Sequence, residues 1–120
     1  MSLSQIGQIS LPVSDANRSE EFYEKTLGMH KLFRYGDLVF FDCAGVRLLL
    51  EGSQKKVEAV ASCLYFKTDH IDEEAAELKS KGAPFDDEPH LIAKMPDHEL
   101  WMAFFRDPDG HLLGLMEERR

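Results

Sequence analysis

The chain has 120 residues, with 14 Lys and Arg against 22 Asp and Glu, which gives a formal net charge of −8. Its length is that of one domain with an ordinary core, and its negative charge disfavours nucleic acid and anionic membrane surfaces as partners. Only two cysteines, no signal-like N-terminus and no run of about 18 apolar residues lead us to expect a soluble, cytoplasmic protein without a disulfide framework or a membrane span.

The N-terminal half is predicted to begin with a strand and a helix. Residues 6–13 alternate between apolar and polar side chains, the period of two that is typical of a strand with one face on a core. Ser14 and Asp15 are suited to cap a helix over about 16–27, in which apolar residues recur at helical spacing. Gly28 supplies the left-handed residue that ends such a helix.

Three short strands are predicted to complete this half. They cover residues 31–34, 38–43 and 46–51, which are apolar or alternating. Gly36-Asp37 and Ala44-Gly45 separate them and are suited to tight turns. The first half therefore has the order β-α-β-β-β.

The second half repeats this order. Residues 63–67 alternate as a strand, Thr68 or Asp69 is expected to cap the following helix, and Gly82 is expected to end it. Turns with Pro or Gly then separate three more strands. These strands are predicted at 90–94, 100–105 and 111–116.

Matching positions of the first strands are 55 residues apart, as in Gln8 and Cys63, and later ones are farther apart because the second half has a longer hairpin. A separation of 65 residues joins Asp42 to Asp107, Gly45 to Gly110 and Leu50 to Leu115. The agreement indicates a tandem duplication within one domain, residues 1–120. Module one spans about 5–52 and module two about 60–118, which gives an α+β fold.

Three motifs in order carry a resemblance to a known family. They are Ile9-Ser10-Leu11-Pro12-Val13-Ser14-Asp15, then Ser19-Glu20-Glu21-Phe22-Tyr23 with Leu27-Gly28, and Phe105-Arg106-Asp107-Pro108-Asp109-Gly110-His111. With the duplicated β-α-β-β-β pattern, they resemble the vicinal oxygen chelate superfamily, the glyoxalase, bleomycin-resistance and extradiol dioxygenase group, over residues 5–118. The resemblance implies a curled mixed sheet around a cavity, helices outside it, and a homodimer.

The resemblance also implies where a metal ion would be bound. Metal-dependent members carry ligands on the first and fourth strands of each module, positions that fall on Gln8, Leu49, Cys63 and Gly114. Only Gln8 is of a ligand type found in the family, so we predict neither a metal nor another cofactor. An irregular set of Gln8, Cys63 and Glu51, which lies two residues beyond Leu49, stays open as an alternative.

Strand parity predicts a pocket lining that is apolar in the middle and charged toward its ends. Arg47 and Lys67 are suited to a carboxylate or phosphate, and Tyr65 offers an aromatic wall with a hydroxyl group. The alternative for both cations is an ion pair with Glu51 or extension into solvent. Trp101 is added as a pocket or interface residue. The predicted ligand-binding residues are Gln8, Ser10, Arg47, Leu49, Glu51, Cys63, Tyr65, Lys67, Trp101, Gly114 and Met116.

Three hypotheses follow for function. The first is a protein of the bleomycin-resistance type that binds a small amphipathic molecule in its cavity without converting it. The second is a glyoxalase I-like lyase or a methylmalonyl-CoA epimerase-like isomerase with a rearranged metal site, or with acid and base groups such as Glu51, Tyr65 and Lys67. The third is an interaction module whose dimer regulates another protein.

Overall fold

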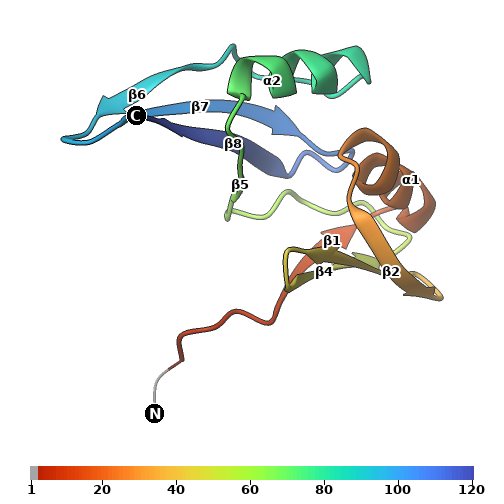
Figure 1. The fold of residues 1–120 in the computed structure, drawn as a ribbon. Coiled ribbons are helices and arrows are strands. Elements are labelled where there is room, and N and C mark those ends of the chain that lie inside the picture. Colours follow the sequence, from red (N-terminus) through yellow and green to blue (C-terminus); the bar gives the residue numbers. More distant parts are fainter. Residues whose placement is uncertain (1–2) are drawn as a thin grey trace. The chain divides into compact units, whose positions relative to one another are not determined.

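A computed structural model describes residues 3–120 of the chain (Figure 1). The chain divides into two compact units, one that ends at Glu58 and one from Ala59 to Arg120. Each unit holds one copy of the predicted β-α-β-β-β order and one four-stranded mixed sheet, which confirms the α+β class. No helix within residues 3–120 has the length and apolar character that crossing a membrane requires.

The first unit forms a sheet in the order β1-β4-β3-β2. Its elements are β1 (Gln8–Val13), α1 (Ala16–Glu21), β2 (His30–Tyr35), β3 (Leu38–Cys43) and β4 (Val46–Gly52). β1 runs parallel to β4, and the other neighbouring strands are antiparallel. Ala44 and Gly45 both have positive φ, 50° and 94°, as a tight two-residue hairpin turn requires.

The helix of the first unit begins and ends where predicted, but its second part is not α-helical. The Asp15 side chain caps it by accepting hydrogen bonds from the backbone N–H groups of Asn17 and Arg18, at 3.0 and 3.2 Å. After Glu21 the helix widens into a π-helical segment, η1 (Phe22–Thr26). Gly28, with φ of 72°, then ends it.

The core of the first unit lies between its sheet and this helix. Tyr23 is fully buried, and its ring centroid lies 6.1 Å from that of Phe41. Alternate residues of three strands join them, as the period of two predicts. The buried strand residues on this side are Leu11, Val13, Val39, Phe41, Leu48 and Leu50.

The second unit repeats the arrangement, with the strand order β5-β8-β7-β6. Its elements are β5 (Leu64–Lys67), α2 (Ile71–Ser80), β6 (His90–Lys94), β7 (Glu99–Arg106) and β8 (Leu112–Arg119). β8 continues three residues beyond the predicted end because it stays paired with the start of β7, where Arg119 is opposite Glu99.

The predicted cap of α2 is wrong. The residue before the helix is His70, whose side chain makes no capping bond, and the Thr68 hydroxyl accepts instead from the His70 N–H at 3.0 Å. The first helical N–H, that of Ile71, donates to Glu117 Oε1 on β8 at 2.8 Å. A residue distant in the sequence thus supplies the acceptor, while Gly82, with φ of 95°, ends the helix as predicted.

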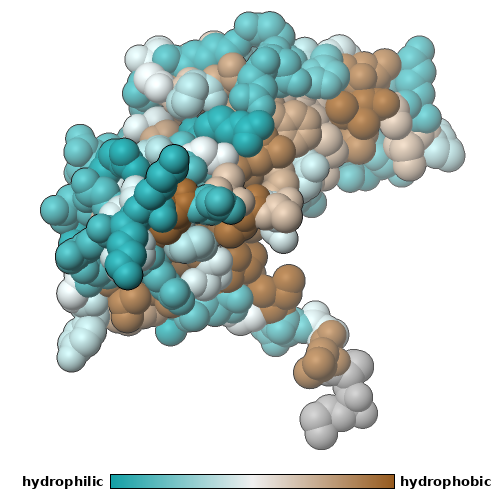
Figure 2. Space-filling view, turned by 180° about the vertical axis from the view of Figure 1, so that it is seen from behind, coloured by the Kyte–Doolittle hydropathy of each residue, from teal (hydrophilic) through white to brown (hydrophobic). Residues whose placement is uncertain are grey.

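Both units have an irregular outer strand. The register of β2 against β3 shifts at Leu32, and that of β6 against β7 shifts at Ile92. These two residues are 42% and 44% exposed. Figure 2 shows apolar residues (brown) at the surface among hydrophilic ones (teal).

Candidate functional site

Each sheet has one face against its own helix and one face turned away from it. In the first unit we call the latter the first helix-free face. The strand register places a mixed set of polar, apolar and aromatic residues on it. They are Gln8, Ser10, Phe33, Leu38, Phe40, Asp42, Arg47, Leu49 and Glu51.

The predicted residues of the first unit all lie on this face. Gln8 is opposite Arg47, and Ser10 is opposite Leu49. The Ser10 hydroxyl donates to Glu51 Oε1 at 2.8 Å, which holds one carboxylate oxygen in place. Leu49 is only 7% exposed, so it forms the apolar floor of the face.

Arg47 packs on an aromatic pair that the sequence analysis did not include. Its guanidinium carbon lies 5.8 Å from the ring centroid of Phe40, a cation–π distance. Phe40 in turn stacks on Phe33, with centroids 4.5 Å apart and an interplanar angle of 23°. Within residues 3–120 no ion pair joins Arg47 to Glu51, and Arg47 is exposed, as the alternative of extension into solvent expects. The alternation of Leu38, Phe40 and Asp42 was the signal that would have found Phe40.

The second helix-free face is more apolar. Four predicted ligand-binding residues lie on it, as the register of β5, β8 and β7 shows: Tyr65, Lys67, Gly114 and Met116. Two apolar residues of β7 that are absent from the predicted set, Met102 and Phe104, lie on the same face. Their alternation along the strand is the signal that would have found them.

Gly114 leaves room for a side chain of the same unit. A Cβ added there would lie 2.9 Å from Tyr65 Cδ1 and 3.2 Å from Phe104 Cε1. The Tyr65 ring therefore lies over the backbone of β8 and meets Phe104 edge-on, with centroids 5.9 Å apart. The absence of a side chain at Gly114 lets the Tyr65 ring approach the strand closely, as is expected at a glycine within a strand.

Cys63 directly precedes β5 and is half-buried. Its thiol donates weakly to the Leu64 carbonyl oxygen at 3.7 Å. Burial raises the pKa of the Cys63 thiol, although Tyr65 and Arg106 oppose the shift. A protonated thiol is a poor nucleophile and a poor metal ligand, because both roles belong to the thiolate.

Trp101 lies apart from the other predicted residues. The register places it opposite Glu117, on the face that carries α2. Its indole N–H donates to Glu99 Oε1 at 3.1 Å, and the Arg119 guanidinium lies over the ring at 4.3 Å. Trp101 is therefore held by residues of its own unit on the opposite face from Tyr65 and Gly114.

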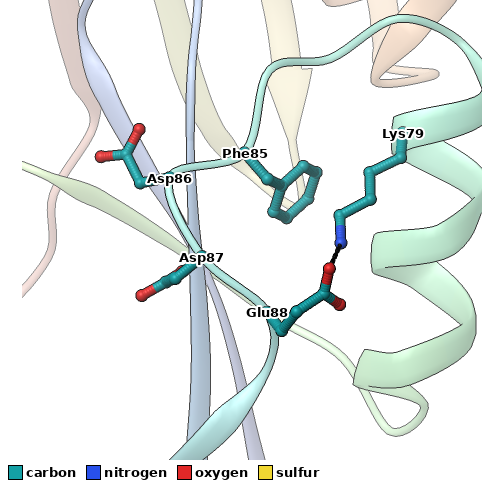
Figure 3. A pocket seen from close by; sticks show the side chains of 5 residues that line it. All are labelled: Lys79, Phe85, Asp86, Asp87 and Glu88. Atoms are coloured by element: carbon teal, nitrogen blue, oxygen red, sulfur yellow. Dashed lines mark hydrogen bonds and ion pairs between the residues drawn. The ribbon is translucent and has the colours of Figure 1, made fainter.

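Hollows elsewhere in the second unit have lining charges that are largely paired. One of about 400 Å³ lies beside α2 and is lined by Lys79, Phe85, Asp86, Asp87 and Glu88 (Figure 3). Lys79 pairs with Glu88 and lies 5.3 Å from the centroid of the Phe85 ring. The Asp86 carboxylate pairs with an arginine, and the Asp87 carboxylate accepts from a backbone N–H. This hollow is a weaker candidate than the helix-free faces.

The comparison with known families gives a match over most of the chain. The model of the Glyoxalase/Bleomycin resistance protein/Dioxygenase superfamily matches residues 5–115. The chain belongs to this superfamily.

Individual relatives in this superfamily are distant. The uncharacterized protein YraH of Bacillus subtilis (strain 168) is 27% identical over 124 residues, which covers 88% of this chain and 92% of YraH. Lactoylglutathione lyase from Agrobacterium tumefaciens has a TM-score of 0.76 at 23% identity, over 98% of this chain and 96% of that one. The fosfomycin resistance protein FosX of Listeria monocytogenes has a TM-score of 0.78 at 19% identity, over 97% and 94%. These two structures share the fold.

The side chains at the expected metal-ligand positions of this glyoxalase-superfamily member offer few donor atoms. Leu49 has no donor atom, and the space beside Gly114 is filled by the Tyr65 ring. The raised pKa of Cys63 opposes a thiolate, which leaves Gln8 as one neutral amide donor. Among residues 3–120, no cluster of three or more His, Cys, Asp or Glu side chains is placed to hold a metal.

Proposed function

We propose that this superfamily member binds a small amphipathic organic molecule through its helix-free sheet faces, without a metal ion or another cofactor. The observation that carries the proposal is the pair of cations on these faces. Within residues 3–120, neither Arg47 nor Lys67 forms an ion pair with a carboxylate, although the chain carries a net charge of −8. A cation without a partner in an acidic protein is suited to an anionic ligand.

Apolar surface beside each cation supports an amphipathic ligand. Arg47 adjoins Phe40 and the buried Leu49, and Lys67 is opposite Met116 in the register. Small-molecule sites in proteins are lined mainly by apolar and aromatic side chains, with a few polar groups that fix the orientation of the ligand. Methionine side chains also adapt to ligands of different shape.

The proposal is tested by metal analysis and thermal unfolding of the same protein. Protein purified without chelator under reducing conditions is expected to carry far less than stoichiometric metal. Zn²⁺, Ni²⁺, Mn²⁺ and Fe²⁺ are expected to leave its Tm unchanged. A panel of aromatic and aliphatic carboxylates and phosphates is expected to contain a binder. At about ten times its Kd, such a ligand stabilises by about 1.4 kcal/mol and raises Tm by about 5 °C.

Two results contradict the proposal. Near-stoichiometric metal that is lost in Gln8→Ala or Glu51→Ala would restore the irregular metal site. A flat Tm across the whole panel would argue against a small amphipathic anion as ligand.

An enzyme of the lyase or isomerase class is the second candidate. The Ser10–Glu51 hydrogen bond favours it, since it holds in place a carboxylate that is suited to act as a general base. The shared fold with lactoylglutathione lyase makes that activity the first to assay. Turnover that is lost in Glu51→Gln, with unchanged folding, would establish this candidate.

We further propose a cytoplasmic homodimer. The free thiols of Cys43 and Cys63 support a reducing compartment. Light scattering on the purified chain tests the dimer, and a mass equal to that of one chain at all concentrations would refute it.

A further inference from the structure

Arg47 differs from four other arginines of this protein in having no carboxylate partner among residues 3–120. Arg34 pairs with Glu20 at 2.7 Å, Arg106 with Asp86 at 2.9 Å, Arg119 with Asp72 at 2.8 Å and Arg120 with Asp97 at 2.8 Å. Arg47 forms no such pair with any residue from 3 to 120. In a chain with 22 acidic residues, an arginine that stays unpaired is available for a ligand.

The carboxylates nearest to Arg47 are engaged elsewhere. Asp42 is directly opposite Arg47 in the register, yet its Oδ1 accepts from the backbone N–H of Gly45 at 3.1 Å. Glu51 accepts from the Ser10 hydroxyl on the same face. His30 is opposite Asp42 on β2 and is the remaining titratable group in this part of the register. Within residues 3–120, neither carboxylate forms an ion pair with the guanidinium.

The aromatic pair orients Arg47 for recognition of a flat group. Phe33, Phe40 and Arg47 follow one another on three neighbouring strands, with the guanidinium over the Phe40 ring. Contact with a ring face fixes a guanidinium while leaving its edge, which carries the N–H donors, open to a planar acceptor. Phe33 is 49% exposed, so aromatic surface beside this donor edge is also accessible.

From this arrangement we propose that the first helix-free face binds a planar aromatic carboxylate. The carboxylate accepts two parallel hydrogen bonds from the Arg47 guanidinium, and the ring packs on the aromatic surface of Phe33 and Phe40. This inference rests on the proposed binding function and narrows its ligand to one chemical class.

A planar aromatic acid satisfies each part of the face. A carboxylate matches the fork of the guanidinium in a bidentate pair, and conjugation keeps an attached ring in the carboxylate plane. A flat ring is the partner that stacked phenylalanines prefer, with an offset or edge-on arrangement. Lys67 on the second sheet offers a point charge, which does not select for planarity.

The test compares 2-naphthoate with two analogues, each of which keeps one of its two features. 2-Naphthoate carries both ring and carboxylate, 2-naphthalenemethanol carries the ring alone, and cyclohexanecarboxylate carries the charge on a non-planar body. Isothermal titration calorimetry on the full chain is expected to show naphthoate binding about 10-fold tighter than either analogue, as a charged bidentate pair implies. Equal affinity for naphthoate and the alcohol would overturn the inference.

Variants of the face then assign the contacts. Arg47→Gln is expected to weaken naphthoate binding about 10-fold and to leave the alcohol unchanged, and Arg47→Lys is expected to recover only part of the loss. Phe40→Leu is expected to weaken both aromatic probes about 5-fold. Arg120→Gln removes a guanidinium at the far end of the chain and serves as the control for net charge. Circular dichroism checks that each variant is folded.

The outcomes separate this inference from the broader proposal. Naphthoate binding that is unaffected by Arg47→Gln but lost in Lys67→Gln overturns the inference and keeps the proposed function. Binding of aliphatic anions without binding of naphthoate likewise overturns the inference and keeps the proposed function. Absence of binding by every anion in the panel overturns both.

Discussion

Gly52 is the position at which one added methyl group should damage the first unit most. It ends β4, and a Cβ there would lie 2.9 Å from Ala16 Cβ, 3.0 Å from Asp37 Cβ and 3.0 Å from the Asp37 carbonyl oxygen. The Gly52 N–H also donates to that carbonyl at 2.9 Å. Ala16 starts α1 and Asp37 lies in the β2–β3 turn, so Gly52→Ala pushes both elements away from the sheet.

The expected destabilisation is the balance of three terms. Overpacking of a close contact costs about 1–3 kcal/mol, and weakening of the hydrogen bond costs about 1 kcal/mol. Replacing glycine stabilises by about 0.4–1 kcal/mol, because the unfolded chain loses freedom and φ here is outside the left-handed region. The net loss is about 2 kcal/mol, or a fall in Tm of about 8 °C.

Thermal and urea unfolding followed by circular dichroism measure this loss, with Gly114→Ala as the matched control. At Gly114 the added methyl group meets the side chains of Tyr65 and Phe104 rather than backbone atoms, and the Tyr65 ring can turn outward because the residue is 46% exposed. We expect the control to lose at most about 1 kcal/mol. A Gly52→Ala protein within about 0.5 kcal/mol of the parent, or more stable than the control, would refute the reasoning.

Further substitutions test the ion pair of Glu20 and the start of α2. The hydrogen bond from Lys31 lowers the pKa of Glu20, so its stabilising contribution is complete above the unfolded pKa of about 4.3 and is lost as pH falls through the lower folded value. Glu20→Gln should therefore lower the free energy of unfolding at neutral pH and reduce its further fall below about pH 4.3. Parallel plots of this free energy against pH for the two proteins would count against the prediction. Glu117→Ala removes the acceptor of the Ile71 N–H and should lower the free energy of unfolding, measured with urea, by about 1 kcal/mol. Asp69→Ala should change this free energy little. A larger loss in Asp69→Ala than in Glu117→Ala would support a local cap by Asp69.

The predictable part of the fold depends on local signals. The alternation in residues 38–43 and the glycine turns on either side predicted β3 with its observed ends. Gly28 and Gly82 were identified as helix ends because left-handed φ is a property of single residues. The π-helical widening after Glu21 has no comparable local signature. The start of α2 was wrong because Glu117, 46 positions from Ile71, supplies the acceptor.

The candidate site shows the same division between local and distant information. Strand parity grouped Ser10, Glu51 and Tyr65 as pocket residues, and the register places them on faces turned away from the helices. Trp101 was included for its residue type, although its alternation with neighbours assigns it to the other face. The Arg47 contact with Phe40 depends on which strand follows which across the sheet, and this order is fixed by folding rather than by spacing along the chain.

The irregularities at Leu32 and Ile92 bear on the pairing of this protein with strands of other molecules. Both lie on outermost strands, where a row of unpaired N–H and C=O groups is a template for a strand of another molecule. A bulge breaks the even spacing of that row and twists the strand, so a flat foreign strand does not match it. The two halves have thus kept the same protection against fibrous association, even though both positions retain an exposed apolar side chain.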